Sequence, residues 1–195
     1  MILGVAGGYC AGKNTLVGLL AEHGFYVVDV DRLGHSILEE NRERIVQAFG
    51  TGTLSPQGGI DRRALGKIVF GHSKQREKLE RIVHPEMVRR VEEIVGQKRE
   101  RIVINAAILF RMGLHRLCDT VICVSAPLLA RLKRARMRDS LSTWQALRRL
   151  LAQRGICPKS NNTDVDIYSV RNSGDRESLR ESVRHFLQEK NMARE

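Results

Sequence analysis

Gly7-Gly8-Tyr9-Cys10-Ala11-Gly12-Lys13-Asn14-Thr15 is the stretch that decides the fold of this chain. It fits the pattern G-x-x-x-x-G-K, with asparagine where the pattern has serine or threonine, and a threonine one place later. An apolar run at 2–6 precedes it, and apolar residues at helical spacing follow it. A strand, a glycine loop and a helix in this order present backbone N–H groups and a positive helix end to an anion. We therefore predict that residues 7–15, called the phosphate loop below, bind ATP, with Lys13 reaching its β- and γ-phosphate oxygens.

The phosphate loop contains most of the predicted ATP contacts and one candidate ligand for a metal ion. The contacts are Gly8, Cys10, Ala11, Gly12, Lys13, Asn14 and Thr15. A hydroxyl at the place of Asn14 commonly coordinates Mg²⁺, and an amide oxygen can do the same. Asn105 ends an apolar run, where an aspartate commonly supports that metal. We expect Mg²⁺ as cofactor, Asn14 as its candidate protein ligand, and an altered metal preference without loss of nucleotide binding.

The rest of the chain predicts an α/β fold. Further β-rich runs lie at 26–28, 102–104 and 120–124, with a weaker one at 166–170, and helical patterns separate them. This alternation favours a three-layer parallel sheet of the P-loop NTPase type, with helices on both faces. Helical patterns at 32–40, 42–49, 62–70 and 76–95 fill a long insertion, whose last helix is expected to be interrupted at His84-Pro85.

We predict three functional parts. The nucleotide-binding core comprises 1–31, 96–130 and 158–195; the helical insertion at 32–95 binds the acceptor; and 131–157 form a basic lid. The lid is expected to be a pair of helices, with Ser142 or Thr143 as an N-cap, and its one tryptophan, Trp144, is expected to pack. Eight bases and one acid fall within 131–154. Guanidinium groups there would neutralise charge on the transferring phosphoryl group, and Arg134 and Arg138 share a helix face.

Asp29 and Asp31 follow the second β-rich run. We expect both to end that strand and face the same side, because residues two apart on a strand do so. One of them could orient an acceptor hydroxyl and take its proton. The alternative is that one caps a helix and the other is a solvated charge.

Composition limits the function classes. The 195 residues are 42% hydrophobic, enough for a core, and no run is long enough to cross a membrane, so we expect a cytoplasmic protein without a membrane partner. The net charge of +11 attracts polyanions, but only 5% of residues are aromatic, which argues against nucleic acid. The four cysteines show no metal or disulfide spacing, and we expect Cys118, Cys123 and Cys157 to be small buried hydrophobes. Cys10 lies near a helix N-terminus, which could lower its pKa.

Several separated blocks resemble dephospho-CoA kinases. The blocks are the phosphate loop, 27–35, 60–70, 79–85, 134–153 and 172–174. The resemblance implies transfer of the ATP γ-phosphoryl group to the ribose 3′-hydroxyl of dephospho-CoA, with Asp31 as catalytic base beside Lys13. It further implies that Arg138 and Asn172 contact ATP and that Asp31, His35, Arg63 and His84 contact the acceptor. By its own pattern, His84 before Pro85 more often indicates a hydrogen-bonded histidine at a helix kink than a ligand.

The chain departs from that family pattern at three places. Cys10 replaces a usual glycine, Asn14 replaces the hydroxyl residue, and residues 105–111 read Asn-Ala-Ala-Ile-Leu-Phe-Arg where the family resembles Asp-x-Pro-Leu-Leu-Phe-Glu. Two alternatives therefore stay open from the residues. One is another small-metabolite kinase of the same fold, and the other is a nucleotide-sensing or nucleic-acid-binding protein that kept ATP affinity and lost transfer. Nothing in the sequence indicates an oligomeric state.

Overall fold

The computed structural model describes residues 1–69, 71–97, 99–139, 143–152, 156–158, 163–174 and 176–190. The chain divides into two compact units, one of Met1–Val28 with Gln97–Glu195 and the other of Asp29–Gly96. Ser142, one of the two expected N-caps of the lid, lies outside the described residues. Among the described residues, no helix combines the length and the apolar character needed to cross a membrane.

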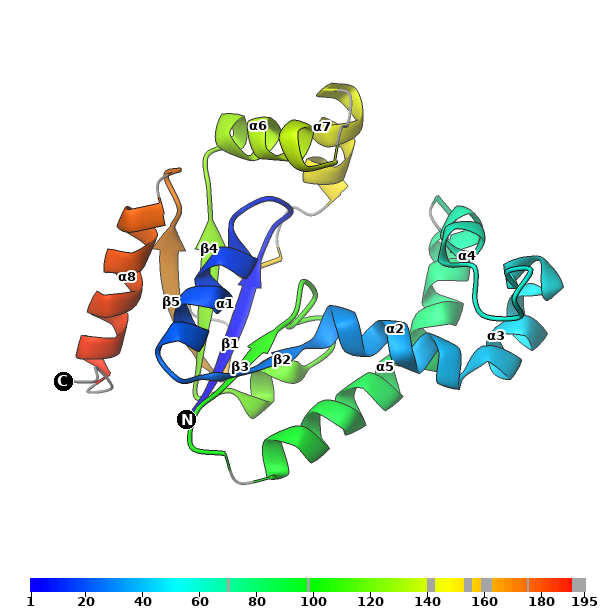
Figure 1. Ribbon diagram of the computed structural model, residues 1–195, viewed down its shortest axis with the longest axis horizontal. Helices are drawn as coiled ribbons and strands as arrows, with labels where there is room; N and C mark the ends of the chain where they lie inside the picture. The colour runs from blue at the N-terminus through cyan, green and yellow to red at the C-terminus, as the bar shows by residue number, and fades with distance from the viewer. Residues whose placement is uncertain are drawn as a thin grey trace. The chain divides into compact units, whose positions relative to one another are not determined.

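The first unit is built on a five-stranded sheet in the order β2-β3-β1-β4-β5. The strands are β1 (Ile2–Gly7), β2 (Tyr26–Asp29), β3 (Ile102–Asn105), β4 (Thr120–Ser125) and β5 (Asp166–Arg171). β1 pairs in parallel with β3 and β4, and β4 with β5. The predicted parallel α/β sheet is therefore confirmed, and the pairing brings the carboxyl ends of β1 and β4 to the same edge, where Figure 1 shows the phosphate loop and the start of α6.

One face of this sheet carries the main core of the unit. Helices α1 (Lys13–Glu22) and α8 (Arg176–Glu189) pack on it. Leu3 and Val5 of β1 contribute to the same cluster as Leu16 of α1 and Phe186 of α8. Because strand residues alternate between faces, Gly4 looks to the opposite side, where a Cβ atom would meet Cys118 Sγ at 2.9 Å and Leu109 Cδ1 at 3.1 Å.

The lid segment forms two helices in the first unit, α6 (Leu128–Asp139) and α7 (Thr143–Ala152). They pack against each other, and α6 follows directly from the carboxyl end of β4 (Figure 1). Trp144 does not pack as expected, because 78% of it is exposed. Ala135 and Ala146, one on each helix, are the small residues buried there.

The second unit is helical. It contains α2 (Val30–Glu40), α3 (Arg42–Phe49), a short 3₁₀ turn η1 (Thr51–Thr53), α4 (Arg62–Val69) and α5 (Ser73–Gly96). Ile45, Ile60, Leu65 and Val69 form its core. The expected interruption at His84-Pro85 is wrong, since α5 continues through Pro85. A proline inside a helix costs roughly 3 kcal/mol, and packing of α5 on α2 and α4 offsets that cost.

The start of α2 corrects the interpretation of the two aspartates. Asp29 ends β2 and caps α2, with its Oδ1 accepting a hydrogen bond from the Arg32 backbone N–H at 3.0 Å. Asp31 lies in the first turn of α2 rather than on a strand. The prediction that both end a strand and face one side is therefore wrong, because the chain turns into a helix at Val30.

Replacing Asp29 by alanine is expected to lower the free energy of unfolding by about 1 kcal/mol, because the Arg32 N–H loses its acceptor. Urea unfolding followed by circular dichroism measures this difference. Asp29→Asn is the matched control, since an asparagine side chain still caps the helix. Equal destabilisation in both variants would show that the negative charge matters and the cap does not.

Candidate active site

The phosphate loop turns sharply between β1 and α1. Cys10 has φ of 58° and Gly12 has φ of 101°, so two nearby residues adopt the left-handed conformation. The Ala11 N–H donates to the Gly8 carbonyl at 3.0 Å, which closes the turn, and α1 begins at Lys13. Residues of alternating handedness, placed at a helix N-terminus, form the concave backbone nest that binds anions.

Cys10→Gly is expected to stabilise the protein by about 0.5 kcal/mol. A residue with a Cβ atom loses roughly 1 to 2 kcal/mol in the left-handed region, and the extra freedom of glycine in the unfolded chain recovers only part of this gain. Cys10→Ala, which keeps the Cβ atom, should show no gain. The midpoint of urea unfolding distinguishes the two, and a stabilised alanine variant would refute the explanation by strain.

The outer side of the phosphate loop is clamped by side chains from remote segments. Arg131 Nε donates to the Tyr9 carbonyl at 2.9 Å, and Arg134 Nη1 donates to the carbonyls of Cys10 at 3.2 Å and Ala11 at 3.4 Å. Asn172 Nδ2 also donates to the Ala11 carbonyl, at 3.0 Å. The loop carbonyls are thus held outward by α6 and by the segment after β5.

The clamp explains why Gly12 is required. A Cβ atom on Gly12 would lie 2.0 Å from Asn172 Nδ2. Asn172 is itself fixed, because its Oδ1 accepts from Arg134 Nη2 at 3.0 Å and only 6% of the residue is exposed. The predicted ATP contact at Asn172 therefore lies against the phosphate loop.

The side-chain amides of Asn105 and Asn14 form a short hydrogen-bonded network with Lys13 of the loop. Lys13 Nζ donates to Asn105 Oδ1 at 2.7 Å, and Asn105 Nδ2 donates to Asn14 Oδ1 at 3.4 Å. Asn105 is buried at the end of β3, next to β1, which is why it reaches both loop residues. The three polar side chains thus meet at the carboxyl edge of the sheet. Asn105 thus positions Lys13 through a neutral amide oxygen.

Arg138, the lid arginine expected to contact ATP, lies over the loop from α6. Its guanidinium is 5.0 Å from the Tyr9 ring centroid and donates to both oxygens of Asp139, at 2.9 and 3.1 Å. The Tyr9 hydroxyl donates to the same carboxylate. The hydrogen bonds to Asp139 raise the pKa of Arg138 above its usual range. An anion on the loop would compete with Asp139 for this guanidinium.

Burial shifts the pKa values of Cys10 and Arg131. Burial raises the pKa of the Cys10 thiol, and this outweighs the opposing effect of the Arg138 charge. The lowering of this pKa that a nearby helix N-terminus could produce therefore does not prevail. Burial also lowers the pKa of Arg131. Its Nη2 is buried and has no hydrogen-bond partner within the described ranges.

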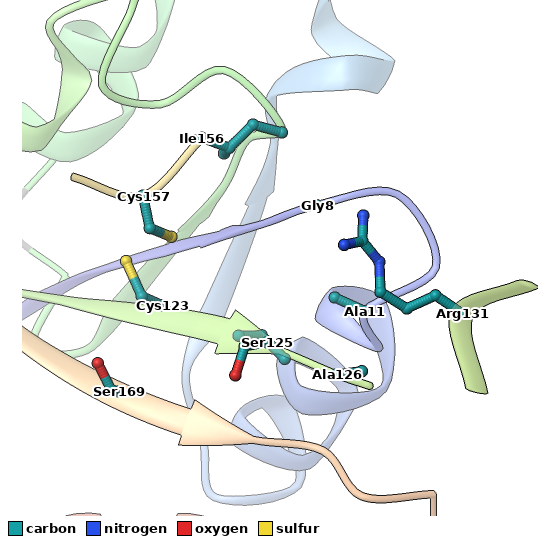
Figure 2. A pocket seen from close by; sticks show the side chains of 10 residues that line it. Gly8, Ala11, Cys123, Ser125, Ala126, Arg131, Ile156, Cys157 and Ser169 are labelled. Carbon is teal, nitrogen blue, oxygen red and sulfur yellow. The ribbon is translucent and has the colours of Figure 1, made fainter. Parts of the chain in front are cut away.

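Arg131 lines a pocket of about 320 Å³ beside the loop. Gly8 and Ala11 of the phosphate loop form part of its wall, and Cys123 and Cys157 form another part. Figure 2 shows the Arg131 side chain extending alongside the loop near Gly8. A buried cationic donor beside a phosphate-binding loop can be satisfied by an anionic oxygen.

The predicted acceptor residues all belong to the helical unit. Gly34 of α2 lies against Met87 of α5, where a Cβ atom would meet Met87 Cε at 3.2 Å. Asp31 and His35 are within one turn of Gly34 along α2, and His84 is within one turn of Met87 along α5, so the three lie on the parts of these helices that are near their contact. Arg63 is exposed at the start of α4.

Arg131, Tyr9 and Asp139 are site residues that the sequence interpretation did not identify. Arg131, Arg134 and Arg138 follow an i, i+3, i+7 spacing, which places them on one face of a helix. This spacing is the signal that could have selected these three from the eight bases. Tyr9 and Asp139 carry no such signal, because their contact joins residues far apart in the sequence.

Comparisons with known proteins agree with this geometry. The family model described as dephospho-CoA kinase matches residues 1–177. A dephospho-CoA kinase from Moorella thermoacetica is 37% identical, over 96% of this chain and 91% of that protein. Two solved structures are also similar. A Thermus thermophilus protein has a TM-score of 0.80 at 28% identity, with 97% of each chain covered. A dephospho-CoA kinase from Campylobacter jejuni has a TM-score of 0.69 at 27% identity, with 97% of this chain and 96% of that one covered.

Proposed function

The chain belongs to the dephospho-CoA kinase family, and on this premise we propose that it transfers the γ-phosphoryl group of ATP to the ribose 3′-hydroxyl of dephospho-CoA, giving CoA and ADP. The observation that carries the proposal is the clamped phosphate loop, with Lys13 fixed at its end. ATP and dephospho-CoA as substrates, and the cytoplasm as location, are parts of the same proposal.

On the nucleotide side, the residues position the phosphates and neutralise their charge. The backbone of residues 8–15 surrounds the phosphate oxygens, and Lys13 reaches the β- and γ-phosphates. Arg138 exchanges Asp139 for the γ-phosphate oxygens when ATP is bound. Arg131 Nη2, buried without a partner among the described residues, supplies a further donor to an anionic oxygen. Asn172, packed on Ala11, contacts the nucleotide beyond the loop.

The residues present fit a magnesium ion that is held chiefly by its nucleotide. Among the described residues, no group of three or more His, Cys, Asp or Glu side chains could bind a metal. Asn14 is exposed, and its hard amide oxygen accepts a long hydrogen bond of 3.4 Å from Asn105, whereas Asn105 Oδ1 accepts a short one of 2.7 Å from Lys13. Mg²⁺ commonly takes one or two protein ligands, with phosphates and water completing its octahedron. When bound, the ion neutralises charge on the phosphate oxygens.

Asn14→Ser is expected to lower the Mg²⁺ concentration for half-maximal rate by roughly tenfold. Serine places a compact hydroxyl oxygen beside the phosphates and removes the competing amide donor. The measurement is the initial rate against free Mg²⁺ at fixed ATP. Asn14→Ala, which offers no oxygen, is the control and should raise the requirement. An unchanged requirement in both variants would exclude Asn14 as a metal ligand.

On the acceptor side, the helical unit binds dephospho-CoA. Asp31 accepts the proton of the 3′-hydroxyl and orients that oxygen toward the γ-phosphorus. The first turn of α2 favours a negative charge there, because the positive end of the helix dipole lies at that terminus. His35, Arg63 and His84 offer donors for the phosphate and ribose oxygens of the acceptor.

The proposed function is tested by supplying purified protein with ATP, dephospho-CoA, and either Mg²⁺ or Mn²⁺, and by measuring CoA and ADP. We expect stoichiometric formation of both products. ADP without CoA would indicate a different acceptor or hydrolysis. ATP binding without turnover in either metal would contradict the proposal and favour a nucleotide sensor.

A further inference from the structure

Cys123 and Cys157 come from distant parts of the first unit and meet at the pocket beside the phosphate loop. Cys123 lies on β4, with 6% of its surface exposed, and Cys157 lies in the described segment 156–158 between α7 and β5. Figure 2 shows their sulfur atoms facing each other. The two side chains share a hydrogen bond, and both residues are free thiols.

We propose that Cys123 and Cys157 are a reversible oxidation site, at which a low-molecular-weight disulfide such as oxidised glutathione closes a bond that restrains the α6–α7 segment. Cross-linking needs sulfur atoms that approach each other without rearrangement of a strand, and the two thiols, which are hydrogen-bonded and face each other in Figure 2, meet that condition. The effect on α6–α7 rests on the proposed function, whereas the covalent modification does not.

The two thiols differ in the way that such a reaction requires. The hydrogen bond from Cys123 lowers the pKa of Cys157 and raises that of Cys123. Cys157 is also the more exposed of the two, so it is the attacking group and Cys123 the resolving one. Cys118 differs from both, because burial raises its pKa to about 12 and its Sγ donates to the Leu114 carbonyl at 3.3 Å.

The reaction balances as two successive exchanges. The Cys157 thiolate attacks one sulfur of the reagent, whose S–S bond breaks, and one thiolate leaves with a proton from solvent. Cys123 then loses its proton and attacks the Cys157 sulfur of the mixed disulfide, which releases the second reagent thiol. Two electrons pass from the protein to the reagent, and the two protons lost by the cysteines are balanced by those on the released thiols.

The position of this bond in the chain predicts its effect. β4 runs from Cys123 into α6, and the chain returns from α7 to Cys157. A disulfide would therefore fix both ends of the α6–α7 segment to the same strand. That segment carries Arg131 and Arg138, and Arg138 is the group proposed to move from Asp139 to ATP. The oxidised protein is expected to lose kcat, because a lid that cannot rearrange cannot complete the site.

The experiment uses the full chain, reduced and then treated with oxidised glutathione. The expected product lacks the mass of two hydrogen atoms, and peptide mapping joins Cys123 to Cys157. We expect kcat to fall roughly tenfold and dithiothreitol to restore it. Cys118→Ser should still form the bond, whereas Cys157→Ser should not form it and should keep its kcat under oxidant. Cys123→Ser should not form the bond either. If that variant fails to fold, peptide mapping of the unmutated chain still shows whether Cys123 and Cys157 are joined.

Each contrary outcome overturns a defined part of the inference. A stable glutathione adduct on Cys157, a bond that involves Cys10 or Cys118, or an unchanged mass would exclude the oxidation site. A Cys123–Cys157 bond with unchanged kcat would exclude the restraint on α6–α7. The activity of the reduced chain is measured first, so a failure of the proposed kinase function is seen separately from the mapping result.

Discussion

Lys13→Ala is expected to lower kcat for CoA formation by roughly 10²- to 10³-fold and to weaken ATP binding. Lys13 is the cation at the junction of the phosphate loop and α1, and Asn105 holds its ammonium group at 2.7 Å. A positioned charge needs little reorganisation when negative charge develops on the transferring group. Its removal also leaves Asn105 Oδ1 without its lysine donor. Steady-state kinetics and ATP titration measure the two effects.

The control for Lys13→Ala is Lys190→Ala. Lys190 carries the same charge but pairs with Asp166 near the end of α8, outside both proposed binding regions. That variant should keep kcat, because a surface ion pair contributes about 1 kcal/mol or less to stability and touches no substrate. Equal losses in the two variants would attribute the effect to net charge, and an unchanged kcat in Lys13→Ala would remove Lys13 from the reaction.

The fold could be predicted because its signals are local. The strands β1 to β4 are short, mainly apolar runs, β5 shows a weaker pattern, and the helices at 42–49 and 62–69 show apolar residues at helical spacing. The start of α2 could not be predicted in the same way. Alternating aspartates fit a strand end and a capped helix equally well, and only the turn at Val30 decides between them. The effect of Pro85 could not be predicted either. A proline is a local signal for a helix interruption, but α5 continues through it because α5 packs on α2 and α4, which the local sequence does not show.

The candidate site could be predicted where one continuous motif forms it. The phosphate loop lies within nine consecutive residues, so its glycines, Lys13 and the departure at Asn14 were all visible in the sequence. The clamp on the loop could not be predicted, because Arg134 and Asn172 are distant from the loop in sequence and contact it only in the folded chain. The facing of Cys123 and Cys157 is hidden for the same reason, because their spacing matches no local pattern.

The two departures from the family pattern at Asn14 and Asn105 are in contact with each other. Each replaces a group that commonly serves the metal, yet the two amides contact each other and Lys13. An aspartate at 105 would pair its charge with Lys13, whereas the amide leaves the lysine charge unneutralised by that residue. Asn105 therefore positions the Lys13 ammonium without adding a negative charge of its own near the phosphates.

Asp31→Asn is expected to lower kcat by roughly 10²- to 10⁴-fold while ATP affinity stays nearly unchanged. Asparagine keeps the size of the side chain but cannot take the proton of the 3′-hydroxyl. Asp31 lies in the first turn of α2, in the helical unit, and the ATP contacts assigned above all lie in the other unit. The loss should therefore fall on the chemical step, which single-turnover measurements with saturating ATP and dephospho-CoA isolate.

Asp29→Asn is the matched control for Asp31→Asn, since it removes a carboxylate two residues away and keeps an oxygen that caps α2. If Asp31 is the base, only its own variant loses kcat, because the helix and its cap persist in both. A similar fall in both variants would instead assign the effect to negative charge at the start of α2. A normal rate in Asp31→Asn would leave the proton to solvent or to the γ-phosphate itself, and catalysis would then rest on Lys13 and the lid arginines alone.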